Sequence, residues 1–104
     1  MASKAEGLIQ MAMRAGKTIR GDGLISAIIS GKAKLVIYSS TCGDNRRNKL
    51  LNKCATAHIP CLEMPQEDFD RLSTKAMSSL GISDTGFARA IAAKLDQKPE
   101  TQQQ

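Results

Sequence analysis

The run AKLVIYSS at residues 33–40 constrains the fold of this chain more than any other stretch. Its centre, Leu35 to Tyr38, is continuously apolar, whereas a strand with one face in water would alternate apolar and polar residues. Such a run is typical of a strand that is buried on both faces. The sequence therefore predicts a sheet covered by other elements on both sides.

The segments around this strand alternate between strand and helix patterns. Amphipathic helices are predicted at residues 5–15, 21–30, from 43 or 44 to about 57, 66–72, and from 83 or 84 to 95. Strands are predicted at residues 17–19, as a short edge strand, and at 35–38, 61–64 and 76–82. This alternation implies helical crossovers on both faces of the sheet. We expect a three-layer α/β/α sandwich with a roughly four-stranded mixed sheet.

The sequence also predicts which faces of two of these helices turn toward the core. Helix 21–30 is expected to turn one apolar face to the core, made of Leu24, Ile25, Ile28 and Ile29. The third helix is expected to turn an apolar face inward, made of Leu50, Leu51, Cys54 and Ala55, and a basic face largely outward, made of Arg46, Arg47, Lys49 and Lys53. There the two guanidinium groups could reach phosphates, or simply face solvent.

The length of 104 residues is typical of one domain, which we place at residues 1–95. Residues 96–104, DQKPETQQQ, are polar and interrupted by proline, so this tail is expected to be disordered. The sequence contains no signal-peptide pattern and no apolar run near the ~20 residues that span a bilayer. We therefore expect a cytoplasmic protein without a membrane partner.

The charge of the chain is uneven. The net charge is +5, with ten Lys or Arg against three acids in residues 1–53 (+7) and five against seven in residues 54–104 (−2). This asymmetry suggests that the protein has one basic face. Such a face favours a polyanionic partner such as nucleic acid. Aromatic residues make up only 3% of the chain, so it has few aromatic side chains on which bases could stack.

Catalytic and metal chemistry find little support in the sequence. Cys42 follows a predicted strand and precedes a basic helix, and it could be paired with the single histidine, His58, but no third group orients them. The three cysteines form no CxxC pair and lack zinc-ligand spacing, so they are read as reduced thiols. We expect neither an enzyme nor a bound metal or cofactor.

The stretch GKTIRGDG at residues 16–23 is the strongest candidate binding site. It matches neither the phosphate loop G-x-x-x-x-G-K-[ST] nor the dinucleotide motif G-x-G-x-x-G. What remains is a glycine-rich helix start beside Lys17 and Arg20, which would suit a backbone phosphate of a nucleic acid. The alternative is that Gly21 and Gly23 only form a tight turn.

The stretches AEGLIQMAMRAGKTIRGDGLISAIISGKAKLVIYSSTC, CATAHIPCLEM and DTGFARAI together resemble the ribosomal protein L-seven-Ae and L-thirty-e family, and its bacterial branch in particular. The resemblance covers about residues 4–95. It implies the α/β/α sandwich, and it implies binding to RNA, often to sharply bent internal loops called kink-turns. The RNA contacts would lie at the start of the second helix and in the loop near Ser73, Thr74 and Lys75.

The chain departs from the kink-turn motif G-x-N-E-x-x-K of this family. Gly21 matches its glycine, but Gly23, Leu24 and Ala27 stand at the positions of the asparagine, glutamate and lysine. These residues lack the polar groups that would bond base edges, so we expect contact with the RNA backbone and weakened kink-turn specificity.

We thus expect an RNA-binding protein that is associated with the ribosome or with another structured RNA. The expected RNA-binding residues are Lys17, Arg20, Gly21, Asp22, Gly23, Lys34 and Lys75. The alternative is a protein–protein interaction module on the same fold that does not bind RNA.

Overall fold

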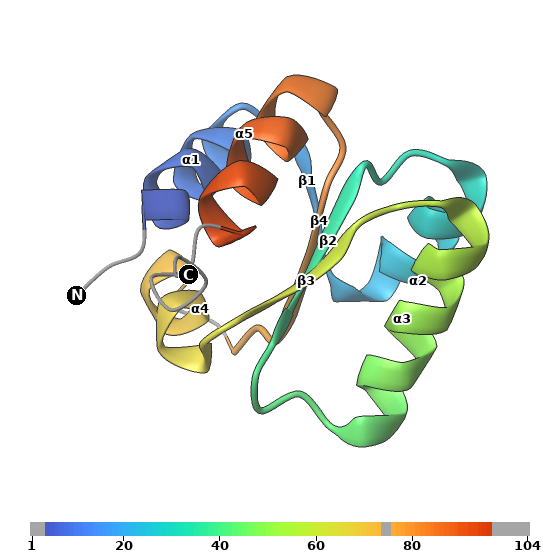
Figure 1. The fold of residues 1–104 in the computed structure, drawn as a ribbon. Coiled ribbons are helices and arrows are strands. Elements are labelled where there is room, and N and C mark those ends of the chain that lie inside the picture. Colours follow the sequence, from blue (N-terminus) through green and yellow to red (C-terminus); the bar gives the residue numbers. More distant parts are fainter. Residues whose placement is uncertain (1–3, 74–75, 97–104) are drawn as a thin grey trace, which may run out of the picture.

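The computed structural model describes residues 4–73 and 76–96 (Figure 1). Its helices are α1 (Lys4–Arg14), α2 (Gly21–Ser30), α3 (Asp44–Ala57), α4 (Gln66–Leu72) and α5 (Thr85–Asp96). Its strands are β1 (Thr18–Ile19), β2 (Leu35–Ser39), β3 (Cys61–Met64) and β4 (Ser79–Ile82). Helix α5 includes Asp96, the first residue of the predicted tail, and residues 97–104 of that tail lie outside the described residues.

The four strands form one mixed sheet in the order β1-β4-β2-β3. Strands β2 and β3 are parallel and are joined by α3, while β4 runs antiparallel to both β2 and β1. The predicted mixed sheet is therefore confirmed, with β1 as the short edge strand.

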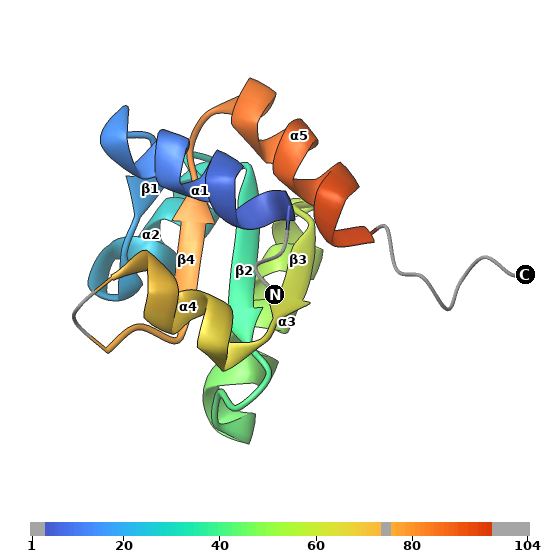
Figure 2. The ribbon, with the colours of Figure 1, turned by 90° about the vertical axis from the view of Figure 1, so that its left-hand side faces the viewer.

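The helices cover both faces of the sheet. Figure 1 shows α1, α4 and α5 on one side and α2 and α3 on the other, and the turned view of Figure 2 places the first group in front of the strands. Leu35 and Ile37 of β2 belong to the first core, and Val36 and Tyr38 belong to the second. Strand β2 therefore contributes side chains to both cores of the domain. Burying one aliphatic side chain of this kind stabilises the fold by about 1.5–3 kcal/mol.

Helix α2 begins and ends where the sequence predicts. Its N-cap, Arg20, has an extended backbone (φ −90°, ψ 171°), and Gly31 ends the helix at φ 82°, with its N–H directed at the carbonyls of Ala27 and Ile28. The predicted core face is wrong at one position, because Ile29 is 67% exposed. Ala27 and Ile28 are buried, and the next residue along the helix is rotated away from the sheet.

The last strand is shorter than predicted. Ser79 pairs with Tyr38 near the end of β2, so the predicted strand residues 76–78 have no ladder to join and form a loop. At the other end, Asp84 supplies the predicted helix cap, since its Oδ2 accepts a hydrogen bond from the Phe87 N–H at 2.9 Å.

A buried acidic pair that the sequence analysis missed links α1 to α4. The carboxylates of Glu6 and Asp68 are buried, and the guanidinium of Arg71 bonds to both. The Nε of Arg71 lies 2.9 Å from Glu6 Oε1, and this bond raises the pKa of the guanidinium. These ion pairs hold α4 against α1, just before the loop that leads to β4.

Helix α2 packs closely on β4 at position 81, where a side chain larger than that of glycine would require Leu24 to move. A Cβ added to Gly81 would stand 2.6 Å from Leu24 Cδ1, and Leu24 is fully buried. We expect Gly81→Ala to lower the free energy of unfolding by about 1–3 kcal/mol through overpacking, measured by chemical denaturation.

Gly7→Ala is the matched control. A Cβ at Gly7 would meet nothing within 4 Å, and the residue lies inside α1, so alanine should raise stability by about 0.5–1 kcal/mol. Equal effects of the two substitutions would contradict the close packing of α2 on β4.

Candidate nucleic-acid interface

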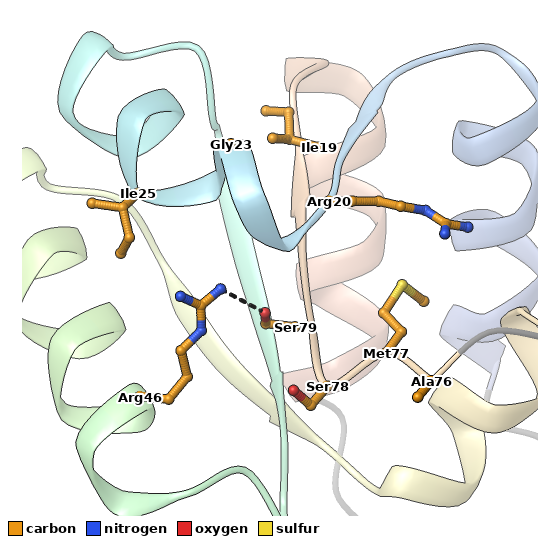
Figure 3. Close-up of a pocket in the computed structure, with 9 residues that line it drawn as sticks. All are labelled: Ile19, Arg20, Gly23, Ile25, Arg46, Ala76, Met77, Ser78 and Ser79. Carbon is orange, nitrogen blue, oxygen red and sulfur yellow. Dashed lines mark hydrogen bonds between the residues drawn. The ribbon is translucent and has the colours of Figure 1, made fainter.

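A groove of about 780 Å³ runs past the start of α2 and the start of β4 (Figure 3). Its lining comes from the β1–α2 corner, from α3 and from the loop that leads into β4. The lining residues are Ile19, Arg20, Gly23, Ile25, Arg46, Ala76, Met77, Ser78 and Ser79. Its volume lies within the ~300–1,000 Å³ of ordinary ligand sites.

The start of α2 gives one end of this groove a positive potential. Aligned peptide dipoles place a partial positive charge at a helix N-terminus. The side chain of the N-cap residue, Arg20, makes no capping hydrogen bond, and the Gly23 N–H closes the first turn on the Arg20 carbonyl at 3.1 Å. The positive end of the helix dipole thus lies beside Arg20, while Asp22 in the same turn adds one negative charge.

Two arginines lie on opposite sides of the groove, with Ser79 between them (Figure 3). Arg20 is exposed, and its Nη2 lies 3.4 Å from Ser73 Oγ. Arg46 Nη2 donates to Ser79 Oγ at 3.2 Å. Each guanidinium carries its N–H donors in a planar fork that matches the geometry of a phosphate.

Arg46, predicted to face largely outward, is half-buried and lines the groove, and Ala55, predicted to face inward, is exposed. Arg46 lies one helical turn before Leu50 and two before Cys54, both buried, so it shares their face of α3. This i, i+4, i+8 spacing was the signal in the sequence that could have placed Arg46 in the site. Arg47 instead pairs with Asp44 at 2.8 Å and does not line the groove.

Among the residues of α2 whose side chains the structure describes, a glycine and an aliphatic residue face the groove. Gly23 and Ile25 line it, whereas Leu24 is 0% and Ala27 is 6% exposed against the sheet. The positions matched to the glutamate and lysine of the kink-turn motif therefore face the core. Ile19, Ile25 and Met77 give the groove apolar surface beside its two arginines.

Two predicted site residues, Lys17 and Lys34, lie at the far end of β4. The Lys17 carbonyl accepts from the Ser83 N–H at 2.8 Å, and the Lys34 N–H donates to the Ile82 carbonyl at 2.6 Å. Three residue steps of ~3.3 Å separate Ile82 from Ser79, so these backbones lie roughly 10 Å along the strand from the groove. The predicted set is thus divided between the two ends of the sheet.

The remaining predicted residues are placed as follows. Gly21 and Asp22 form the first turn of α2, between Arg20 and Gly23, which both line the groove. Lys75 lies outside the described residues. On either side of it, Ser73 contacts Arg20, and residues 76–78 line the groove, so the loop expected to make the second contact does border the same site.

Cys42 and His58 do not form the catalytic pair considered above. Cys42 precedes α3 and is buried, and His58 follows its last residue at φ 60°. The 14 residues of α3, at ~1.5 Å each, hold the two side chains about 20 Å apart.

The other two thiols contact each other. A hydrogen bond with Cys54, together with burial, raises the pKa of the Cys61 thiol. Both cysteines are free, and Cys61 is therefore a neutral thiol at physiological pH. Within residues 4–73 and 76–96, no three His, Cys, Asp or Glu side chains gather in a way that could hold a metal ion.

A search of the helices in the described ranges finds none with the length and apolarity needed to span a membrane.

Comparison with known proteins places the chain in a family, although no family model matches it. The RNA-binding protein YlxQ of Enterococcus faecium is 38% identical over 88 residues, which are 83% of this chain and 85% of that protein. A solved structure of a protein with unknown function from Bacillus halodurans C superposes with a TM-score of 0.86 at 31% identity. That match covers 91% of this chain and 99% of the other. The chain therefore belongs to the ribosomal protein L-seven-Ae and L-thirty-e family, in the branch that contains YlxQ.

Proposed function

We propose that this protein binds structured RNA in the groove at the start of α2. The observation that carries the proposal is the groove itself, which combines the start of α2 with Arg20 and Arg46 on opposite sides. The name of its relative YlxQ, an RNA-binding protein, supports the same function.

The backbone of the RNA makes the principal contacts in this proposal. Guanidinium groups bind phosphates through paired, charge-assisted hydrogen bonds. Arg20 and Arg46 hold two phosphates, and a third lies against the start of α2, where Gly23 adds no side chain to obstruct it. The net charge of +5 adds a longer-range attraction for the polyanion.

The apolar wall of the groove favours RNA with an unstacked nucleotide over a plain duplex. Ile19, Ile25 and Met77 offer surface to the face of a base that has left its stack. From residue 23 onward, α2 contributes only Gly23 and Ile25 to the described lining, and neither can form a hydrogen bond to a base edge through its side chain. The target is a bent or looped RNA, such as a ribosomal RNA element or a kink-turn, recognised mainly by shape.

The double variant Arg20→Ala/Arg46→Ala tests the site. Removing two phosphate contacts should weaken binding to a bent internal-loop RNA roughly ten- to hundredfold at low salt. The slope of log affinity against log salt should fall by about two, since each lost phosphate contact changes it by about one. Fluorescence anisotropy across a salt series measures both quantities.

Lys49→Ala/Lys53→Ala is the matched control, since it removes the same charge from an exposed part of α3 outside the groove. Either double variant lowers the net charge from +5 to +3, which is 5 − 2. A loss of less than about threefold is expected for the control. Equal losses of RNA affinity in the two double variants would show that the groove is not the binding site.

Gly23→Ala separates RNA binding from folding. A Cβ at this position would lie 3.8 Å from Ile19 Cγ2, which is an ordinary contact, so the fold accepts it. Alanine should leave stability unchanged or raise it by up to about 1 kcal/mol, because it favours helix. It also places a methyl group in the groove, so RNA affinity should fall roughly three- to tenfold.

Thermal unfolding and RNA anisotropy on the same sample give the two readouts. A Gly23→Ala protein that is as stable as the parent and binds RNA equally well would show that the RNA backbone does not approach this turn of α2.

A further inference from the structure

A second groove, of about 290 Å³, lies at the other end of the sheet. It is bounded by the start of β2, the turn before β3 and one face of α5. Its lining residues are Lys34, Pro60, Thr85, Ala88, Arg89 and Ala92. The Lys34 N–H bonds to the Ile82 carbonyl at the end of β4, away from the Ser79 end where the RNA groove lies.

The lining of this groove differs in kind from that of the RNA groove. Pro60, Ala88 and Ala92 give it an apolar surface, and Thr85 supplies the one hydroxyl among its lining side chains. Two exposed cations, Lys34 and Arg89, stand beside this surface. Lys34 Nζ donates to the Gly31 carbonyl at 2.9 Å, at the C-terminal end of α2, where the helix dipole offsets only part of the ammonium charge.

The neighbouring acid, Asp84, bonds to the backbone at the start of α5. Asp84 precedes α5, and its Oδ2 is engaged by the N–H of Phe87 as the helix cap. No acid contributes to the lining of this groove among the described residues. The lining of this groove therefore combines apolar side chains with two positively charged ones, Lys34 and Arg89.

We propose that this groove binds a short acidic segment of a partner protein, with an aliphatic side chain against Ala88 and Ala92 and carboxylates beside Lys34 and Arg89. Charge complementarity selects the acidic segment, and the apolar lining selects an aliphatic residue within it. The volume is just below the ~300–1,000 Å³ of small-molecule sites, which suits one side chain of a peptide rather than a whole cofactor.

Peptide fits this surface better than RNA does. A nucleic-acid backbone is held by N–H and O–H donors that reach its phosphates, and proline and alanine side chains have none. The proposal goes beyond RNA binding, since it uses a surface at the opposite end of β4. One molecule can then hold an RNA and a protein partner together.

The experiment is an amide-resolved NMR titration of the full chain with a short synthetic peptide in which two leucines are flanked by glutamates. Amides of Ala88, Arg89 and Ala92 should shift and saturate. Replacing the leucines by serine, or the glutamates by lysine, should each weaken binding at least roughly tenfold, because apolar contact and charge are both required.

Lys34→Ala/Arg89→Ala should weaken binding of the leucine–glutamate peptide roughly tenfold or more, while Lys49→Ala/Lys53→Ala should leave it within threefold. Shifts of equal size with the serine peptide would overturn the proposal, because charge alone would then explain them. Saturation of the same amides by an RNA duplex, or no shifts with any peptide, would also overturn it. None of these outcomes depends on the RNA groove, so the two proposals fail separately.

Discussion

Leu24 packs against Gly81, and this contact holds α2 beside β4, where the candidate RNA-binding groove lies. Because Gly81 has no Cβ, Leu24 reaches the sheet, and the first turn of α2 is held beside β4. Arg20 precedes that turn, and Gly23 lies within it. If a Cβ at position 81 pushed α2 outward, the start of the helix would move away from Arg46 and Ser79 on the opposite side of the groove.

Strand β4 connects two surfaces of different chemistry. At Ser79 it meets the groove with two arginines and the start of α2, and at Ile82 it meets the start of β2 beside the second groove. The first surface suits a phosphate backbone and the second an acidic, aliphatic peptide. Basic charge alone does not distinguish these partners, whereas the groups beside each charge do.

Much of the fold could be predicted from the sequence because local signals agreed with one another. The apolar run of β2, the glycine after α2 and the proline before β3 each marked a boundary that the structure has. The start of β4 was missed because it depends on pairing with Tyr38, a contact that is distant in sequence. The same holds for Glu6, whose burial is explained only by Arg71, 65 residues away.

The candidate site was harder to predict than the fold. Arg20 and Gly23 were found because the glycine-rich helix start is a local pattern. Lys17 and Lys34 were grouped with them on charge, although the sheet places their backbones at the other end of β4. Arg46 was left out because a basic residue near a helix start was read as solvent-facing, while its spacing from Leu50 placed it inward.

Binding to a kink-turn RNA and to a plain duplex of equal length, each titrated with salt, tests the central claim most directly. We expect both RNAs to bind at low salt with affinities within about tenfold, the kink-turn somewhat tighter, because backbone contacts dominate. Both affinities should fall with salt, with a slope of roughly 0.9 per phosphate contact for the duplex. A preference for the kink-turn of more than about hundredfold that persists at high salt would contradict backbone recognition, because it would require base-edge contacts. Absence of binding to either RNA would contradict RNA recognition by this groove.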